Sequence, residues 1–285
     1  MTIKHYLLII IIMFLFGSAY PIGKIALNTS IPPILMSSLR MGIVFLCLLP
    51  FWRFKIPDKK DLIPLLVFGL IMGVGVNLFM NLSLLQATII SPIIIGSQLA
   101  IPFGIIASSI FLKEKISFLK SCFILLIFLG IIFIGFDPEL SNQKYAFFLV
   151  TIMSIFYAAA NITSRYLKKL EVTLTNSIMG LVGFIVLLLI SIFLEGNTVY
   201  HLNNITFTTW LLIGYSAILV SIFGHMSMFY LLRFYPVPKT LPFYSLFPVF
   251  GLIQTFFLFN EIPTLMVIIG GIIVLVSVYI LNRLK

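Results

Sequence analysis

IPFGIIASSIFLKEKIS at positions 101–117 returns in altered form as FPVFGLIQTFFLFNEIPT at positions 247–264. In both copies a proline and a glycine open an apolar run, which closes at a single glutamate. The two glycines are 147 residues apart (251 − 104), and so are the two glutamates (261 − 114). The prolines miss this register by one residue. A repeat this weak needs support from the rest of the chain.

The composition assigns the chain to a membrane. Hydrophobic residues make up 61% of the sequence and charged residues 9%, with a mean hydropathy of +1.20. Each apolar run is long enough for one helix across a bilayer of ~30 Å, and too uniformly apolar for the strands of a barrel. The first run also has features of a signal peptide, with a small-residue cleavage site at residues 17–19, and this alternative stays open. Ten runs are expected as helices: 6–26, 34–51, 62–84, 90–112, 118–136, 145–167, 174–194, 207–232, 240–259 and 265–284.

The charges predict how the chain is oriented. If the first helix starts in the cytoplasm, 15 of the 18 basic residues fall on that side, among them Arg53, Lys55 and Lys285. Basic loops remain in the cytoplasm, so we expect a multi-pass protein of the bacterial inner membrane with both termini cytoplasmic. The net charge of +10 is explained by these loops, and nucleic acid is not expected as a partner. The lipid bilayer is expected as a partner.

The first and sixth helices support the repeat. FLFGSAYPIGKIAL, from Phe14, aligns with SIFYAAANITSRYL, from Ser154. Each half then holds five helices, in residues 1–137 and 145–285, and an odd number inverts the second half relative to the first. We therefore predict an all-α integral membrane protein with ten transmembrane helices arranged as two inverted five-helix repeats.

The sequence resembles the drug/metabolite transporter superfamily, specifically proteins with two EamA-type domains. The resemblance rests on Phe16 and Gly17, where the family commonly has Trp-Gly, on Arg40, and on the endings LKEKIS and FNEIPT. These endings are similar to the family's Leu-Gly-Glu-Arg-Leu-Ser/Thr, with Lys113 and Asn260 in place of its glycine. The resemblance implies a transporter with eight helices around a cavity and two outside, and it favours export.

Polar side chains at helical spacing are the candidates for contact with a solute. Asn77 and Asn81 continue the four-residue stripe of Gly69 and Gly73, and the sixth helix carries a comparable stripe. Such stripes face protein or water rather than lipid. Hydrogen bonds between helices remain the alternative. The predicted substrate-binding residues are Tyr20, Asn77, Asn81, Gln98, Tyr157, Asn161 and Tyr244.

Four further residues are predicted to have structural or gating roles. Pro102 and Pro248 each remove a backbone hydrogen bond, which makes gating kinks or simple packing kinks. Arg40 lies deep in its helix, with binding of a substrate carboxylate as a second interpretation. His225 suits either packing or proton coupling. No acid lies in mid-helix, and Glu114 and Glu261 are expected to cap the helices that follow them.

The predicted function is alternating-access export of an amino acid or a close derivative. Uptake or exchange of another metabolite, such as S-adenosylmethionine or a different nucleotide-derived solute, is an alternative. A membrane-embedded enzyme or a structural scaffold is a third, although no clustered His, Asp or Glu supplies a base or a metal site. We expect neither a metal nor a cofactor. The sequence does not give the substrate, the coupling ion or the oligomeric state.

Overall fold

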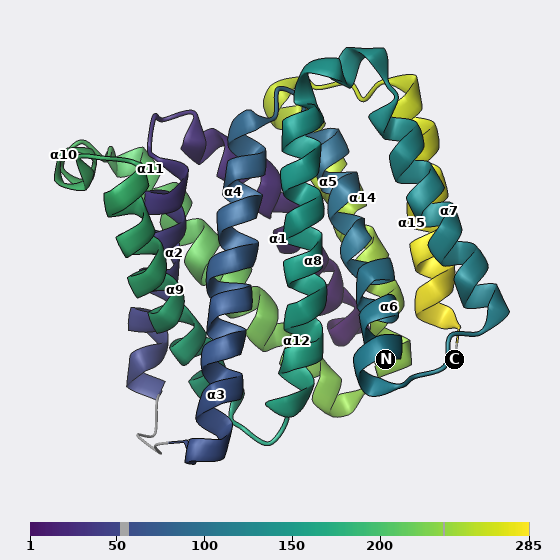
Figure 1. Cartoon of the computed structure of the whole chain (residues 1–285), viewed down its shortest axis with the longest axis horizontal. Coiled ribbons are helices and arrows are strands. Elements are labelled where there is room, and N and C mark those ends of the chain that lie inside the picture. The colour runs from purple at the N-terminus through teal and green to yellow at the C-terminus, as the bar shows by residue number, and fades with distance from the viewer. Residues whose placement is uncertain (52–56, 236, 285) are drawn as a thin grey trace.

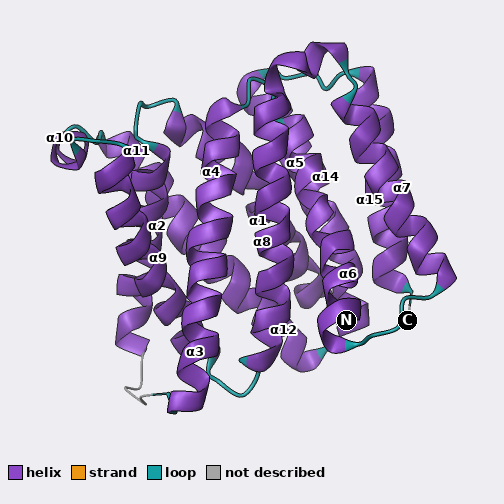
Figure 2. Cartoon of the chain, in the orientation of Figure 1, coloured by secondary structure: helices purple, strands orange, loops and turns teal. Residues whose placement is uncertain are grey.

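A computed structural model describes residues 1–51, 57–235 and 237–284. In these ranges the chain forms helices and loops without a strand (Figure 2). Ten helical spans are long and apolar enough to cross a membrane, which confirms the predicted number and, within a few residues, the boundaries. Arg53, Lys55 and Lys285 lie outside the described residues. Five spans are single helices: α1 (Ile3–Leu27), α7 (Phe118–Gly135), α8 (Lys144–Tyr166), α9 (Val172–Leu194) and α15 (Leu265–Arg283).

The other five spans change helix type along their length. The second span is α2 (Pro33–Leu48) followed by the 3-10 turn η1 (Leu49–Phe51). A short helix, α10 (Thr198–Asn203), and the 3-10 segment η4 (Pro138–Gln143) lie in connections. The third span is α3 (Lys59–Phe68), η2 (Gly69–Val76) and α4 (Asn77–Gln86), and the fourth is α5 (Ser91–Gly96), η3 (Ser97–Leu99) and α6 (Ala100–Leu112). The eighth is α11 (Phe207–Tyr215), η5 (Ser216–Gly224) and α12 (His225–Phe234), and the ninth is α13 (Val237–Thr240), η6 (Leu241–Ser245) and α14 (Leu246–Phe259).

Both chain ends lie on one face of the bundle (Figure 1). We call this the terminal face and the opposite one the distal face. Because each half contributes five spans, the first half enters from the terminal face and the second half from the distal face. The chain therefore has the predicted inverted two-repeat architecture.

Small residues let helices of the two halves approach closely. A Cβ on Gly17 of α1 would lie 2.6 Å from the Phe247 carbonyl oxygen and 2.7 Å from the Gly251 nitrogen of α14. Gly73 in η2 meets the Met179 carbonyl of α9 at 2.6 Å in the same way. The glycine stripe of the third span is thus a packing face, as is usual for small residues in membrane helices.

Helices α7 and α15 form one end of the molecule, where they lie side by side (Figure 1). Their shared core is aliphatic, with Ile127, Ile134, Val274 and Val278 buried. These are the fifth and tenth spans, which the sequence places outside the other eight. The functional elements therefore have to come from the remaining eight spans.

The 147-residue register recurs in features that residue identity does not reveal. The only π-helical segments in the described chain are η2 and η5, and their first residues, Gly69 and Ser216, are 147 apart (216 − 69). Lys113 and Asn260 both adopt left-handed backbone, with φ of 55° and 52°. This conformation explains why the family favours glycine at these positions.

Candidate solute site

Three of the predicted tyrosines meet between the two repeats. Tyr20 of α1 is 7% exposed and stacks on Phe247 of α14, with 6.5 Å between the ring centroids. Tyr157 of α8 packs against the same hydrophobic cluster as Tyr20, and Tyr244 packs on Phe16 of α1 with 6.1 Å between the ring centroids. Tyr20 also interacts with Ser97 of η3. Helices of both halves thus bring their phenol groups to one place in the interior.

Gln98 adds an unsatisfied acceptor beside this cluster. Its side chain is 2% exposed, and its amide nitrogen makes one long contact of 3.5 Å with the Ser97 hydroxyl. Its Oε1 atom is buried and has no hydrogen-bond partner in the described chain. A buried acceptor without a partner is costly, so it marks a position where a ligand or water would be stabilised.

The kink prolines act on the same region. A proline leaves the carbonyl four residues earlier without its α-helical donor. For Pro102 that carbonyl belongs to Gln98, and for Pro248 it belongs to Tyr244. Both prolines are buried and lie just beyond a 3-10 segment, η3 or η6. The Gln98 carbonyl nevertheless accepts from the Ala100 N–H group, and the Tyr244 carbonyl accepts from the Leu246 N–H group, so the prolines lie next to the predicted site without leaving these carbonyls unpaired.

The two asparagines of α4 are engaged within the protein. Asn77 Nδ2 donates to the carbonyls of Met72 at 2.9 Å and Gly73 at 3.2 Å, which belong to the π-helical turn before it. Asn81 Nδ2 donates to the Ser37 hydroxyl of α2 at 2.6 Å. Both side chains are buried, so in this conformation they connect helix segments. A contact of either residue with solute stays a prediction.

Asn161 differs from the other candidates because it is exposed. It lies on α8 toward the terminal face, and Ser164 and Arg165 one turn further are exposed as well. Ser154, earlier on the same stripe, is fully buried against the carbonyls of Gly96 and Ser97. The stripe therefore runs from a closed interior to an accessible end.

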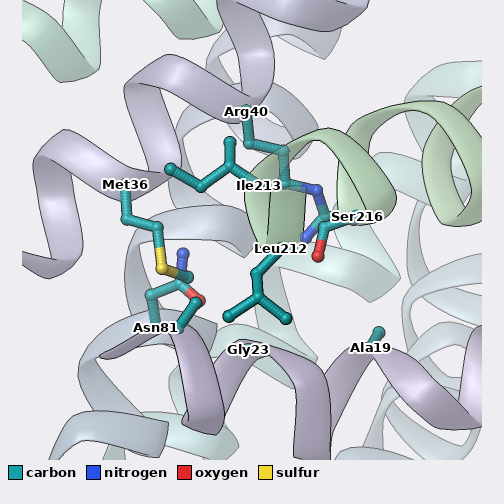
Figure 3. Close-up of a pocket in the computed structure, with 9 residues that line it drawn as sticks. Ala19, Gly23, Met36, Arg40, Asn81, Leu212, Ile213 and Ser216 are labelled. Carbon is teal, nitrogen blue, oxygen red and sulfur yellow. The ribbon is translucent and has the colours of Figure 1, made fainter. Parts of the chain in front are cut away.

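Arg40 and His225 are held by one residue of η5, Ser221. The Nε and Nη2 atoms of Arg40 donate to the Ser221 hydroxyl at 3.2 and 2.8 Å. His225 Nδ1 lies 2.9 Å from the Ser221 carbonyl, and its ring is 5.0 Å from that of Phe16. Figure 3 shows Arg40 pointing into a small cavity beside Ser216. The π-helical η5 thus supplies the hydroxyl that holds the arginine.

The glutamates at the repeat endings do not cap the helices that follow them, which corrects the prediction from sequence. The caps are Ser117 for α7 and Thr264 for α15. Glu261 instead reaches the other repeat, where its carboxylate accepts from the backbone N–H groups of Ile90 and Ser91, both at 2.8 Å, at the start of α5. The Ser91 hydroxyl donates to it as well. A carboxylate at a helix N-terminus is favourable, but sequence alone could not show which helix.

Glu114 has a different partner. On the terminal face its carboxylate pairs with Arg165 of α8, and both side chains are about half exposed, at 50% and 43%. The hydrogen bond from Arg165, together with one from Ser108, lowers the pKa of Glu114 below its ordinary value of 4.5. The two acids of the repeat are therefore in unlike environments.

Further carboxylates tie the distal face. Glu195, after α9, accepts from the backbone N–H groups of Ile34 at 2.6 Å and Leu35 at 2.8 Å, at the start of α2. Asp137 accepts from the Thr264 hydroxyl. Helix termini leave N–H groups unsatisfied, and Glu195 satisfies two of them across the boundary between the halves, whereas Asp137 links the halves through a side-chain hydroxyl. Within the described residues, no group of three or more His, Cys, Asp or Glu could hold a metal ion.

The geometry of two inverted five-helix halves agrees with the family comparison. Residues 3–136 and 144–283 each match the model of the EamA-like transporter family. The chain belongs to the EamA-like transporter family. Membership in this family, within the drug/metabolite transporter superfamily, makes it a multi-pass membrane transporter of small solutes, and it points away from an enzyme.

Individual relatives of this EamA-like transporter agree. A protein of Archaeoglobus fulgidus described as an uncharacterized transporter is 29% identical over 234 residues, which cover 79% of each chain. A crystal structure of a protein aligns with a TM-score of 0.64 over 98% of this chain and 96% of that one, at 13% identity. At that identity the likeness shows the fold alone.

Proposed function

We propose that this transporter exports an amino acid or an amino-acid derivative across the bacterial inner membrane by alternating access. The cluster of Tyr20, Tyr157 and Tyr244 with Gln98 is the observation that carries the proposal; Tyr20 and Gln98 are buried, and the other two tyrosines are half-buried. Phenols and an unpaired amide oxygen suit a neutral or zwitterionic solute. The repeats, residues 1–137 and 145–285, are the two bodies that move.

The conformation fits one stage of such a cycle. Toward the distal face the cluster is closed by the contact of Glu261 with the start of α5. Toward the terminal face Asn161 is exposed, and nothing lies within 4 Å of the position of a Cβ on Gly104. Polar side chains are not stable against lipid, so we assign this side to water. The site opens to the terminal face.

The terminal face is proposed to be cytoplasmic. The loops on this side carry Lys113, Lys115, Lys168, Lys169 and Lys239. Basic residues in short loops are retained in the cytoplasm during insertion. An opening to the cytoplasm is where an exporter collects its solute, whereas an uptake system or exchanger uses the same opening for release.

Flux into proteoliposomes tests the function. We expect vesicles with the wild-type chain to move at least one of a panel of radiolabelled L-amino acids down an imposed gradient. Tyr157→Ala should reduce that flux on the order of tenfold, which corresponds to ~1.4 kcal/mol of lost contact. Tyr145→Ala, on the exposed first turn of the same helix, is the matched control and should transport normally.

Three results would overturn this proposal. No flux of any amino acid by the wild-type chain would remove the substrate class, and flux only with a counter-solute inside the vesicles would favour exchange. Full activity of Tyr157→Ala at normal levels of inserted protein would remove the tyrosine cluster as the solute site.

A further inference from the structure

A small cavity borders the tyrosine cluster, because its lining residues Met36 and Ile213 belong to the same hydrophobic cluster as Tyr20. Figure 3 shows it between α1, α2, α4 and the α11–η5 span. Its floor is made by the small residues Ala19 and Gly23 of α1, and Met36 and Leu212 form apolar walls. Arg40 stands at one end and Asn81 at the other. Its volume is about 10 Å3, room for one water molecule.

Arg40 brings a positive charge to this cavity without a balancing one. A guanidinium has five N–H groups. In the described chain, the hydrogen-bond acceptor of Arg40 is the Ser221 hydroxyl, which accepts from Nε and Nη2. The ion pairs of Lys60 with Asp58 and of Arg165 with Glu114 do not involve Arg40. An arginine inside a membrane is costly unless it is paired.

Lys24 shows what a saturated membrane cation looks like in this protein. Its ammonium group donates to the carbonyls of Leu84 at 2.8 Å, Leu85 at 3.3 Å and Ala87 at 2.6 Å. All three N–H groups are used, and they complete the C-terminal end of α4. Lys24 therefore has a structural role, whereas Arg40 keeps donors for another acceptor.

We propose that Arg40 binds the carboxylate of a small solute in this cavity. The planar guanidinium matches a carboxylate with two parallel hydrogen bonds. An apolar side chain of the solute would contact Met36 and Leu212. The Oδ1 atom of Asn81 lies 4.0 Å from the position of a Cβ on Gly23, so it offers an acceptor at the opposite end. This inference rests on the proposed function, for which it names the group recognised.

The small volume gives the proposal a mechanical consequence. A carboxylate with a side chain does not fit into about 10 Å3, so α11–η5 has to move away from α1 and α2 for it to enter. In its π-helical turn the Ser221 hydroxyl donates to the Ser216 carbonyl at 3.1 Å, and the same hydroxyl accepts from Arg40. Binding of the anion and opening of the eighth span are thus coupled.

Thermal unfolding of the purified full-length chain in detergent tests the proposal without reference to transport. The probe is sodium isovalerate, a carboxylate with a branched apolar tail, against isovaleramide and sodium chloride at matched ionic strength. We expect isovalerate alone to raise the Tm, by about 2–4 °C at saturation. Arg40→Gln should abolish the shift, and Arg40→Lys should reduce it, because an ammonium lacks the fork.

Lys24→Gln is the matched control. It should lower the starting Tm but leave the isovalerate shift intact, because its cation is already satisfied. Equal shifts with isovalerate and isovaleramide, or an undiminished shift in both Arg40 variants, would overturn the proposal, and so would a shift with inorganic phosphate only. Since these shifts do not require transport, a wild-type chain that binds isovalerate but moves no amino acid would sink the proposed function and leave this site standing.

Discussion

The two copies of the repeat each end with a glutamate at the same register, but the two glutamates have different partners. On the distal face Glu261 caps a helix of the opposite repeat with two backbone hydrogen bonds of 2.8 Å. On the terminal face Glu114, at the same register, forms a half-exposed ion pair with Arg165. The residues that match Ile90 and Ser91 at this end are Val237 and Pro238 (90 + 147 and 91 + 147). Proline has no N–H group, so the same cap cannot be fully formed there.

This difference explains how two copies of one repeated sequence can be held with different strength. A half-buried carboxylate on a helix terminus holds its side firmly, because it satisfies N–H groups that have no other partner. An exposed ion pair contributes little and exchanges easily with water. The distal end is therefore the stronger seal, and the terminal end the one that opens with less cost.

The largest effect is expected at the close contact of Gly17 with α14. Gly17→Ala places a Cβ 2.6 Å and 2.7 Å from backbone atoms of α14, which cannot move aside as a side chain can. The free energy of unfolding should fall by about 3 kcal/mol, the upper part of the range for overpacking. Denaturant unfolding in detergent measures it.

Gly104→Ala is the matched change in the open half. Nothing lies near its Cβ position, so alanine should raise the free energy of unfolding by up to about 1 kcal/mol through helix propensity. Equal destabilisation by both substitutions would show that the two halves are packed alike.

The acid pair gives the next effect. Glu261→Gln removes the charge from the hydrogen bonds at the start of α5 and should cost about 2 kcal/mol of unfolding free energy. A loss as small as that expected below for Glu114 would contradict the assignment of Glu261 to the distal seal. Thermal unfolding and hydrogen exchange at Ile90 and Ser91 report it.

The left-handed residues distinguish the two ends at the same register. Lys113→Gly should raise the free energy of unfolding by about 1 kcal/mol, because glycine adopts φ near 55° without strain. Asn260→Gly should gain less, since asparagine tolerates this region better. A larger gain at Asn260 would mean that contacts rather than backbone strain decide the difference.

The smallest effect is at Glu114. Glu114→Gln should cost about 0.5 kcal/mol or less, because the pair is exposed and screened. Its pKa is lowered by Arg165, so its contribution is complete above the ordinary value of 4.5 and is lost as the pH falls through the lowered one. The Tm difference between wild type and Glu114→Gln should vanish on acidification. A difference that grows toward low pH would exclude the ion pair as its source.

Much of this architecture was predictable because membrane helices can be recognised in a sequence by their length and apolarity. Ten spans, inversion and the outer position of α7 and α15 all follow from runs such as 118–136 and the odd helix number. The partners of Glu261 and Glu195 did not follow, because a carboxylate's target depends on which helix end packs beside it. The π-helices gave no local signal beyond the glycines of η2.

The candidate site was predicted in part for a similar reason. Spacing placed Tyr20, Tyr157 and Tyr244 on inward faces, and the structure brings them together. The sequence could not show that Asn77 donates to carbonyls of its own helix, because the π-helical turn that frees these carbonyls is invisible in the sequence. It also left open what faces Arg40, which depends on side chains 181 positions away.

Accessibility from the two faces tests the central claim, a distal seal with an opening to the terminal face. In a chain whose Cys47 and Cys122 are replaced, Ser164→Cys in oriented vesicles should react with a membrane-impermeant thiol reagent from the terminal face. Ala26→Cys, 2% exposed in the distal half, should not react from either face. Adding Glu261→Gln should make Ala26→Cys reactive from the distal face. Equal labelling of both cysteines with Glu261 intact, or no change on its replacement, would contradict the account.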